Sequence, residues 1–145
     1  MRHCMNQRET VYRVANELRT NAHRIADELP AGRARVADQL RGTTTAIVFR
    51  IAASAGTSAP DEQARLYRMA RHSTTEAAAI LDACRIVSPS DEPALDAARK
   101  LLLQIFAGLT DLLAGTPASS AAGSRHLLDR LHLTVDVHLG GQARR

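Results

Sequence analysis

Arginines in the first third of the sequence have a spacing that suits the binding of phosphate groups. Arg8 and Arg19 are eleven residues apart. In an α-helix this separation is about three turns, so both side chains project from the same flank. Neither arginine has an acidic residue four positions later that would neutralise it. Guanidinium groups repeated along one flank predict a ladder of phosphate contacts.

A second group of arginines opens the next predicted helix. Arg33, Arg35 and Arg41 lie near its start and are offset only by Asp38. Positive charge in a first helical turn opposes the helix dipole, so local stability does not explain these residues. They indicate either an anion bound nearby or an acidic residue supplied by another subunit.

Other arginines leave two interpretations open. Arg50 lies at the edge of the apolar stripe of its helix, where it either reaches solvent or pairs with another helix or subunit. Arg13 and Arg24 form a second ladder, but each is followed four residues later by a glutamate, Glu17 and Glu28. For this outer pair we favour an ordinary solvated face over phosphate binding.

The positive charge is unevenly distributed along the chain. Residues 1–59 carry nine basic and five acidic residues, residues 60–115 carry six and eight, and the remainder carries four and two. We therefore expect an anion-binding face on the first two helices or on the tail.

Helices must position these arginines. Aromatic residues make up 3% of the chain and Trp is absent, which favours helices packed through aliphatic side chains over strands. Apolar residues alternate steps of three and four in four segments, approximately 8–29, 33–53, 60–87 and 91–114. The sequence predicts an all-α domain over residues 1–115, followed by a linker and a C-terminal tail over 116–145.

Local signals mark the ends of the predicted helices. Pro30 stops the first helix, and Ser58 and Ser90 are the expected caps of the third and fourth. Thr43 is expected on the core side of the second helix. The fourth helix is the most apolar, so its extra face either lies deep in the bundle or meets another subunit.

We interpret the tail, residues 116–145, as a docking peptide that contains a short helix and binds a partner. Its histidines, His126, His132 and His138, recur every six residues. This spacing matches no common zinc motif, so we favour surface histidines over a metal site.

Several classes of protein lack support in the sequence. It contains no metalloprotease motif, Gly-rich phosphate loop or carboxylate pair with histidine on a core stripe, so we expect no enzyme, cofactor or metal. Cys4 and Cys84 lie far apart, and Cys84 occupies an apolar stripe, which argues against a disulfide framework. No signal peptide or membrane span is evident, and we expect a soluble cytoplasmic protein.

The sequence resembles a family of four-helix bundle proteins over about residues 8–114. These proteins are encoded in intervening sequences of bacterial large-subunit ribosomal RNA genes, and their relatives are accessory proteins of diversity-generating retroelements. The residues that match the family patterns are Leu29, Pro30, Gln39, Leu40, Arg41, Ile47, Ile51 and Ala52, then Met69, Ala70, Ser73 and Glu76. The chain departs from those patterns at Arg50, Ala53, Ser54 and His72.

The resemblance implies an antiparallel up-and-down four-helix bundle that assembles into a homopentamer and binds RNA or DNA through a basic surface. A reverse transcriptase or another nucleic-acid enzyme is the implied partner. The phosphate contacts would fall to Arg8, Arg19, Arg33, Arg35, Arg41 and Arg50, acting through charge and not through base identity. The scarcity of aromatic residues argues against base stacking, and therefore against sequence-specific recognition of single strands. The alternative is an adaptor that recruits a protein through its tail or its fourth helix.

Overall fold

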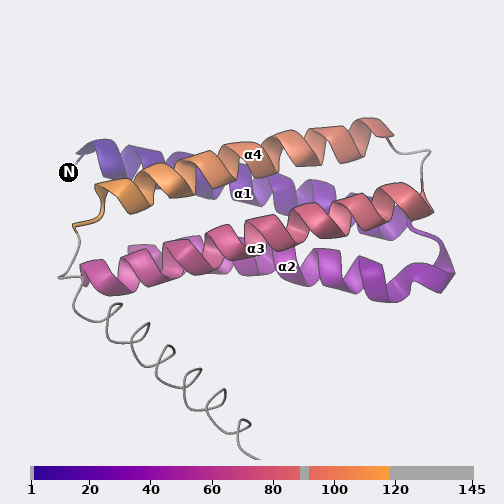
Figure 1. The fold of residues 1–145 in the computed structure, drawn as a ribbon, viewed down its shortest axis with the longest axis horizontal. Coiled ribbons are helices and arrows are strands. Elements are labelled where there is room, and N and C mark those ends of the chain that lie inside the picture. Colours follow the sequence, from indigo (N-terminus) through magenta and orange to yellow (C-terminus); the bar gives the residue numbers. More distant parts are fainter. Residues whose placement is uncertain (1, 89–91, 118–145) are drawn as a thin grey trace, which may run out of the picture.

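The computed structural model describes residues 2–88 and 92–117 of the chain. Figure 1 shows four antiparallel helices that run up and down in chain order, with α1 and α2 forming one layer behind α4 and α3. Each helix packs against two neighbours. The prediction of an all-α four-helix bundle is confirmed. The elements are α1 (Arg2–Glu28), the 3₁₀ turn η1 (Ala31–Arg33), α2 (Ala34–Ala55), α3 (Pro60–Val87) and α4 (Glu92–Gly115).

The core is aliphatic and follows the predicted stripes closely on α1 and α4. Every residue of the predicted α4 stripe is buried, and on α1 only the last residue of the stripe, Leu29, is half-buried. The buried α4 stripe comprises Leu95, Ala98, Leu102, Ile105, Leu109 and Leu112. Removal of this apolar surface from water is the main force that holds the four helices together.

The core faces of α2 and α3 contain most of the predicted positions, among them Leu40, Ile47 and Ile51 on α2, and extend beyond them. Thr44, and not Thr43, is fully buried on α2, and its hydroxyl donates to the carbonyl of Leu40 at 2.8 Å. On α3 the steps of three and four predict a stripe whose residues are Leu66, Ala70, Ser73, Ala77, Ile80, Cys84 and Val87. Leu66, Ile80 and Val87 are half-buried and the rest are buried, and three residues beside the stripe are also buried: Tyr67, Thr74 and Leu81. These helices bury a wider face than a narrow stripe because each packs against two neighbours.

Two helix ends also differ from the sequence-based expectation. α1 begins at Arg2, six residues before the predicted start, since no helix-breaking residue precedes Arg8. The residue that caps α3 is Ala59, and Ser58 makes no side-chain cap. Thr57 holds this turn, because its hydroxyl accepts from the Ala59 amide at 3.2 Å and its carbonyl accepts from the Gln63 side chain at 2.6 Å. The predicted Ser90 cap and the tail lie outside the described residues.

α1 and α4 approach each other closely at one glycine. A Cβ atom built on Gly108 would overlap Cγ2 of Val11. Val11 is buried, so its methyl group fills the space that a side chain at Gly108 would take. The absence of a side chain at Gly108 therefore allows the two helices to pack at this distance.

Among the described residues, no helix is long and apolar enough to cross a membrane.

Candidate nucleic-acid interface

The excess positive charge of the described residues is confined to α1, η1 and the first two residues of α2. Residues 2–35 contain seven arginines and four acidic residues. The remaining described residues, 36–88 and 92–117, contain eight basic and eight acidic residues. Any polyanion attracted by charge would therefore meet α1, η1 and the first residues of α2.

Arg8 lies where α1 passes the end of α2. It is half-buried and lines a groove whose opposite wall includes Ala52 and Ala55 of α2. Arg19 is also half-buried and follows Arg8 on the same flank, as the helical spacing predicts. Neither forms an ion pair within the described part of the chain. No ion pair within the described residues therefore offsets these two guanidinium groups at the α1–α2 border.

Arg33 and Arg35 project from the corner between α1 and α2. Pro30, with φ of −55°, opens the 3₁₀ turn, and the Arg33 amide donates to its carbonyl at 2.8 Å. Both arginine side chains are exposed and have no ion-pair partner among residues 2–88 and 92–117. Neither η1 nor α2 has a side-chain cap at its start. We name these two residues the basic corner.

Arg41 is already occupied by carboxylates. Its guanidinium contacts Asp27 of α1 at 2.6 Å and Asp38 of its own helix at 3.2 Å. The hydrogen bond to Asp27 is the main reason that the pKa of Arg41 is raised above its usual value. Arg41 therefore links α1 to α2, and its net charge at the surface is cancelled by its neighbours.

Arg50 serves as a link between helices. Its guanidinium crosses from α2 to α3, where it donates to the carbonyl of Met69 at 3.1 Å and to the hydroxyl of Ser73. Of the two interpretations of Arg50, the pairing with another helix is confirmed. Its hydrogen bonds to α3 leave fewer donors for an external phosphate.

The outer arginines of α1 differ from the expected solvated ion pairs. Arg13 and Arg24 are exposed, and within the described residues neither contacts an acidic residue closely enough to form an ion pair. The i,i+4 spacing to Glu17 and Glu28 permits such pairs but does not require them, since long exposed side chains have many rotamers. These two residues therefore join the candidates for phosphate contact.

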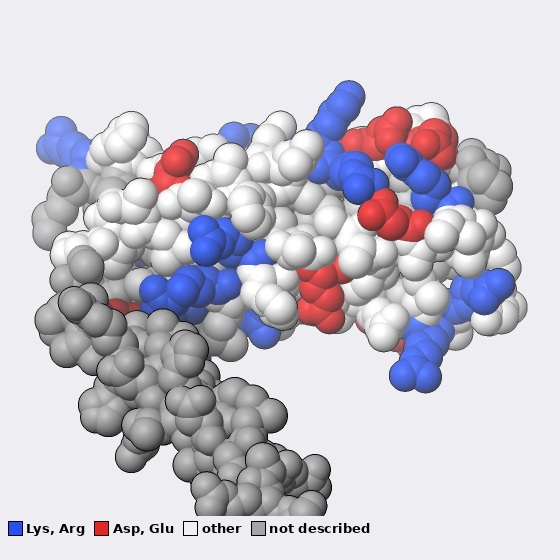
Figure 2. Space-filling view, in the orientation of Figure 1, with Lys and Arg blue, Asp and Glu red and all other residues white. Residues whose placement is uncertain are grey.

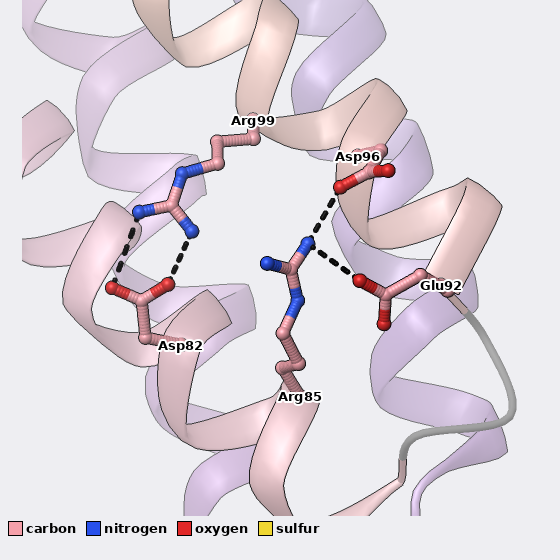
Figure 3. A network of polar contacts seen from close by, with 5 residues as sticks. All are labelled: Asp82, Arg85, Glu92, Asp96 and Arg99. Carbon is pink, nitrogen blue, oxygen red and sulfur yellow. Dashed lines mark hydrogen bonds and ion pairs between the residues drawn. The ribbon is translucent and has the colours of Figure 1, made fainter.

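The opposite layer, α3 and α4, contains six basic and seven acidic residues, although positive side chains also gather toward the end where α4 finishes (Figure 2). Figure 2 shows positive and negative side chains mixed at one end of the α3–α4 side. Figure 3 shows the network responsible, in which Arg85 of α3 contacts Glu92 at 3.1 Å and Asp96 at 2.5 Å on α4. Arg99 of α4 reaches back to Asp82 of α3. Because these arginines bind carboxylates across the two helices, they add little positive potential for a ligand.

The described residues contain no cluster of three potential metal-ligating side chains, and the three tail histidines lie outside them. Cys84 is buried, and desolvation raises the pKa of its thiol above the usual value. A thiol that resists ionisation in an apolar core is a poor nucleophile.

No protein-family model matches this chain, and the searches of curated proteins and of solved structures also yielded no match.

Proposed function

We propose that this four-helix bundle binds RNA or DNA through the phosphate backbone, as an oligomer and without catalytic activity of its own. The observation that carries the proposal is the confinement of all excess positive charge to residues 2–35, against balanced charge elsewhere in the described chain. Phosphates attract such a surface irrespective of base sequence, because binding releases the counterions condensed on the nucleic acid. A polymerase or another enzyme that acts on the bound strand is the partner implied by the family resemblance.

The arginines contribute unequally to this proposed interface. The basic corner supplies two exposed guanidinium groups without an ion-pair partner in the described part of the chain, and Arg8, Arg13, Arg19 and Arg24 extend the charge along α1. Arg41 and Arg50 are expected to contribute less, since their donors are engaged by Asp27 and by α3. We therefore assign most of the phosphate contacts to α1 and the basic corner, and fewer to the rest of α2.

A charge-reversal experiment tests the proposal. Affinity for a mixed-sequence RNA or DNA is measured by fluorescence anisotropy over a series of salt concentrations, for the wild type and for Arg33→Glu with Arg35→Glu. For four phosphate contacts, the logarithm of the affinity should fall with the logarithm of the salt concentration with a slope of about −3 to −4. The double variant should lose affinity at every salt concentration and reduce the magnitude of that slope by about two.

The matched control changes the same amount of charge on the opposite layer. Arg68→Glu with Lys100→Glu replaces two exposed cations of α3 and α4 that have no ion-pair partner among the described residues. Both double variants have the same net charge. Equal losses of affinity would contradict a localised interface, and an absence of binding by the wild type at low salt would contradict the function itself.

A second candidate function is supported by a separate observation on α4. Leu103 is 68% exposed and Phe106 is 42% exposed, and both lie on α4. An exposed apolar face of this kind suits contact with another protein. If the protein is an adaptor that acts through this face, it binds a protein partner. The salt-dependent binding of RNA or DNA described above is then not observed.

A further inference from the structure

The layer formed by α1 and α2 exposes aromatic rings beside its arginines. Tyr12 of α1 is 40% exposed and Phe49 of α2 is 67% exposed. The other tyrosine, Tyr67, is 3% exposed within the core. Packing therefore accounts for Tyr67 but leaves Phe49 mostly exposed and Tyr12 partly exposed.

Tyr12 forms a ridge between two depressions. On its α2 side lies a groove of about 390 Å³, which it shares with Arg8, Ala52 and Ala55. On its other side lies a depression bordered by Arg13 and Asn16. A guanidinium group therefore lies on either side of the Tyr12 ring, within one turn of the same helix.

Phe49 lies on the same layer, close to that groove. It precedes Ala52 by three residues, which places the two side chains one turn apart on neighbouring parts of the α2 surface. The buried positions around it are taken by Val48 and Ile51, so the Phe49 ring points away from the core. The small side chains of Ala52 and Ala55 line the groove beside Tyr12 and leave it open to a ligand.

We infer that the α1–α2 layer binds single-stranded nucleic acid by stacking exposed bases on Tyr12 and Phe49 while Arg8, Arg13 and Arg19 hold the phosphates. This inference rests on the proposed function and specifies its substrate. Aromatic rings stack on bases of any sequence, provided that the bases are not already paired within a duplex. Charge complementarity selects this occupant, since Tyr12 lies on α1, where the excess positive charge of the described residues is concentrated, and Phe49 lies on the adjacent α2.

The position of Glu9 defines how the strand would lie. Glu9 borders both depressions beside Tyr12, and its carboxylate repels phosphate. The phosphates are therefore assigned to the arginines, and the uncharged bases to the surface next to Tyr12 and Glu9.

The test compares an oligothymidylate with a DNA duplex of the same length. Tyr12→Leu and Phe49→Leu should each weaken single-strand binding by about tenfold, because each removes one stacking partner. Affinity for the duplex should stay unchanged, and Tyr12→Phe should retain single-strand affinity since it keeps the ring. The matched control is Phe106→Leu, which removes an exposed ring from α4 and should leave both affinities unaltered.

Tyrosine fluorescence provides a direct readout of stacking. The chain contains no Trp and two Tyr, and Tyr67 is buried. Quenching of the emission by bound oligothymidylate should therefore arise from Tyr12 and should disappear in Tyr12→Phe, although that variant still binds.

The outcomes separate this inference from the proposed function. If the basic-corner variant loses affinity but the two leucine variants keep the wild-type preference for single strands, stacking is overturned and phosphate binding stands. If the wild type binds neither probe at low salt, both proposals fail. If the leucine variants lower the oligomeric mass without changing single-strand affinity, the rings pack between copies of the chain and the inference is overturned.

Discussion

Gly108 shows how a single missing side chain determines the approach of two helices. Its position on α4 faces the buried Val11 of α1, and a Cβ there would overlap the Val11 methyl group unless the Val11 side chain or one of the helices moved. Gly42 on α2 is a suitable comparison because a Cβ at that site would meet nothing within 4 Å. Both sites are glycines within a helix, and they differ in whether a neighbouring side chain occupies the space next to them.

Gly108→Ala should destabilise the bundle by about 1–3 kcal/mol, the usual effect of inserting a methyl group into a packed core. Gly42→Ala should stabilise it by roughly 0.5–1 kcal/mol, since alanine is the better helix former and the site is open. Urea denaturation followed by circular dichroism measures both changes. Val11→Ala should partly rescue Gly108→Ala, and a Gly108→Ala variant as stable as the wild type would contradict the close contact.

At the scale of elements, α3 and α4 are joined by the ion-pair network of Figure 3. The guanidinium of Arg99 holds the pKa of the Asp82 carboxyl below its usual value, mainly through a hydrogen bond. A carboxyl with a lowered folded-state pKa stabilises the fold above its unfolded pKa of about 3.9, and this contribution disappears as the pH falls through the folded value.

Acidification should therefore weaken the wild type more than Asp82→Asn. When the pH falls from about 6 to about 3, the wild type should lose more unfolding free energy than Asp82→Asn. The difference should stay below about 1 kcal/mol, because Asp82 and Arg99 are both exposed to solvent. Urea midpoints at the two pH values provide the measurement. Glu76→Gln, at an exposed glutamate of α3 without an ion pair among the described residues, is the control and should behave as the wild type. Identical losses in Asp82→Asn and the wild type would contradict the pairing.

The elements also show what the sequence could predict. The spacing of apolar residues predicted the four helices and the buried stripes of α1 and α4. This spacing can be read from each segment of the sequence without knowledge of the other helices. The contacts of Arg41 with Asp27 and of Arg50 with Ser73 join different helices, and they depend on how far each helix is rotated about its axis. One hydrophobic period does not determine that rotation, as the burial of Thr44 in place of Thr43 demonstrates. The exposure of Arg33 and Arg35 was predictable because charge at an uncapped helix start has no local partner.

At the scale of the whole molecule, the bundle places two different surfaces on opposite layers. The α1–α2 layer carries the excess positive charge, and α4 in the other layer carries the exposed Leu103 and Phe106. The ring of Phe106 also lies under the guanidinium of Arg71, at 5.7 Å from its centroid. If the α4 surface joins copies of the chain, oligomerisation leaves the proposed nucleic-acid interface accessible.

We expect the chain to sediment as a homopentamer, the assembly implied by the family resemblance. Leu103→Glu should lower that mass towards a single chain of 15.7 kDa, since a charge in an apolar contact between subunits is unfavourable. Analytical ultracentrifugation measures the mass. Gln104→Glu, which adds the same charge at the adjacent exposed position, is the control. An unchanged mass in Leu103→Glu would show that copies of the chain associate through another surface.

The up-and-down order of the helices brings Arg2 and Pro117 to the same end of the bundle (Figure 1). A short peptide can therefore join these two positions, and new termini can be opened in the turn between Leu29 and Pro30. Such a circular permutant would begin with the basic corner and finish with α1, while every pair of neighbouring helices stays the same. In this permutant the basic corner and α1 lie at opposite ends of the chain, but they remain neighbours in the folded bundle.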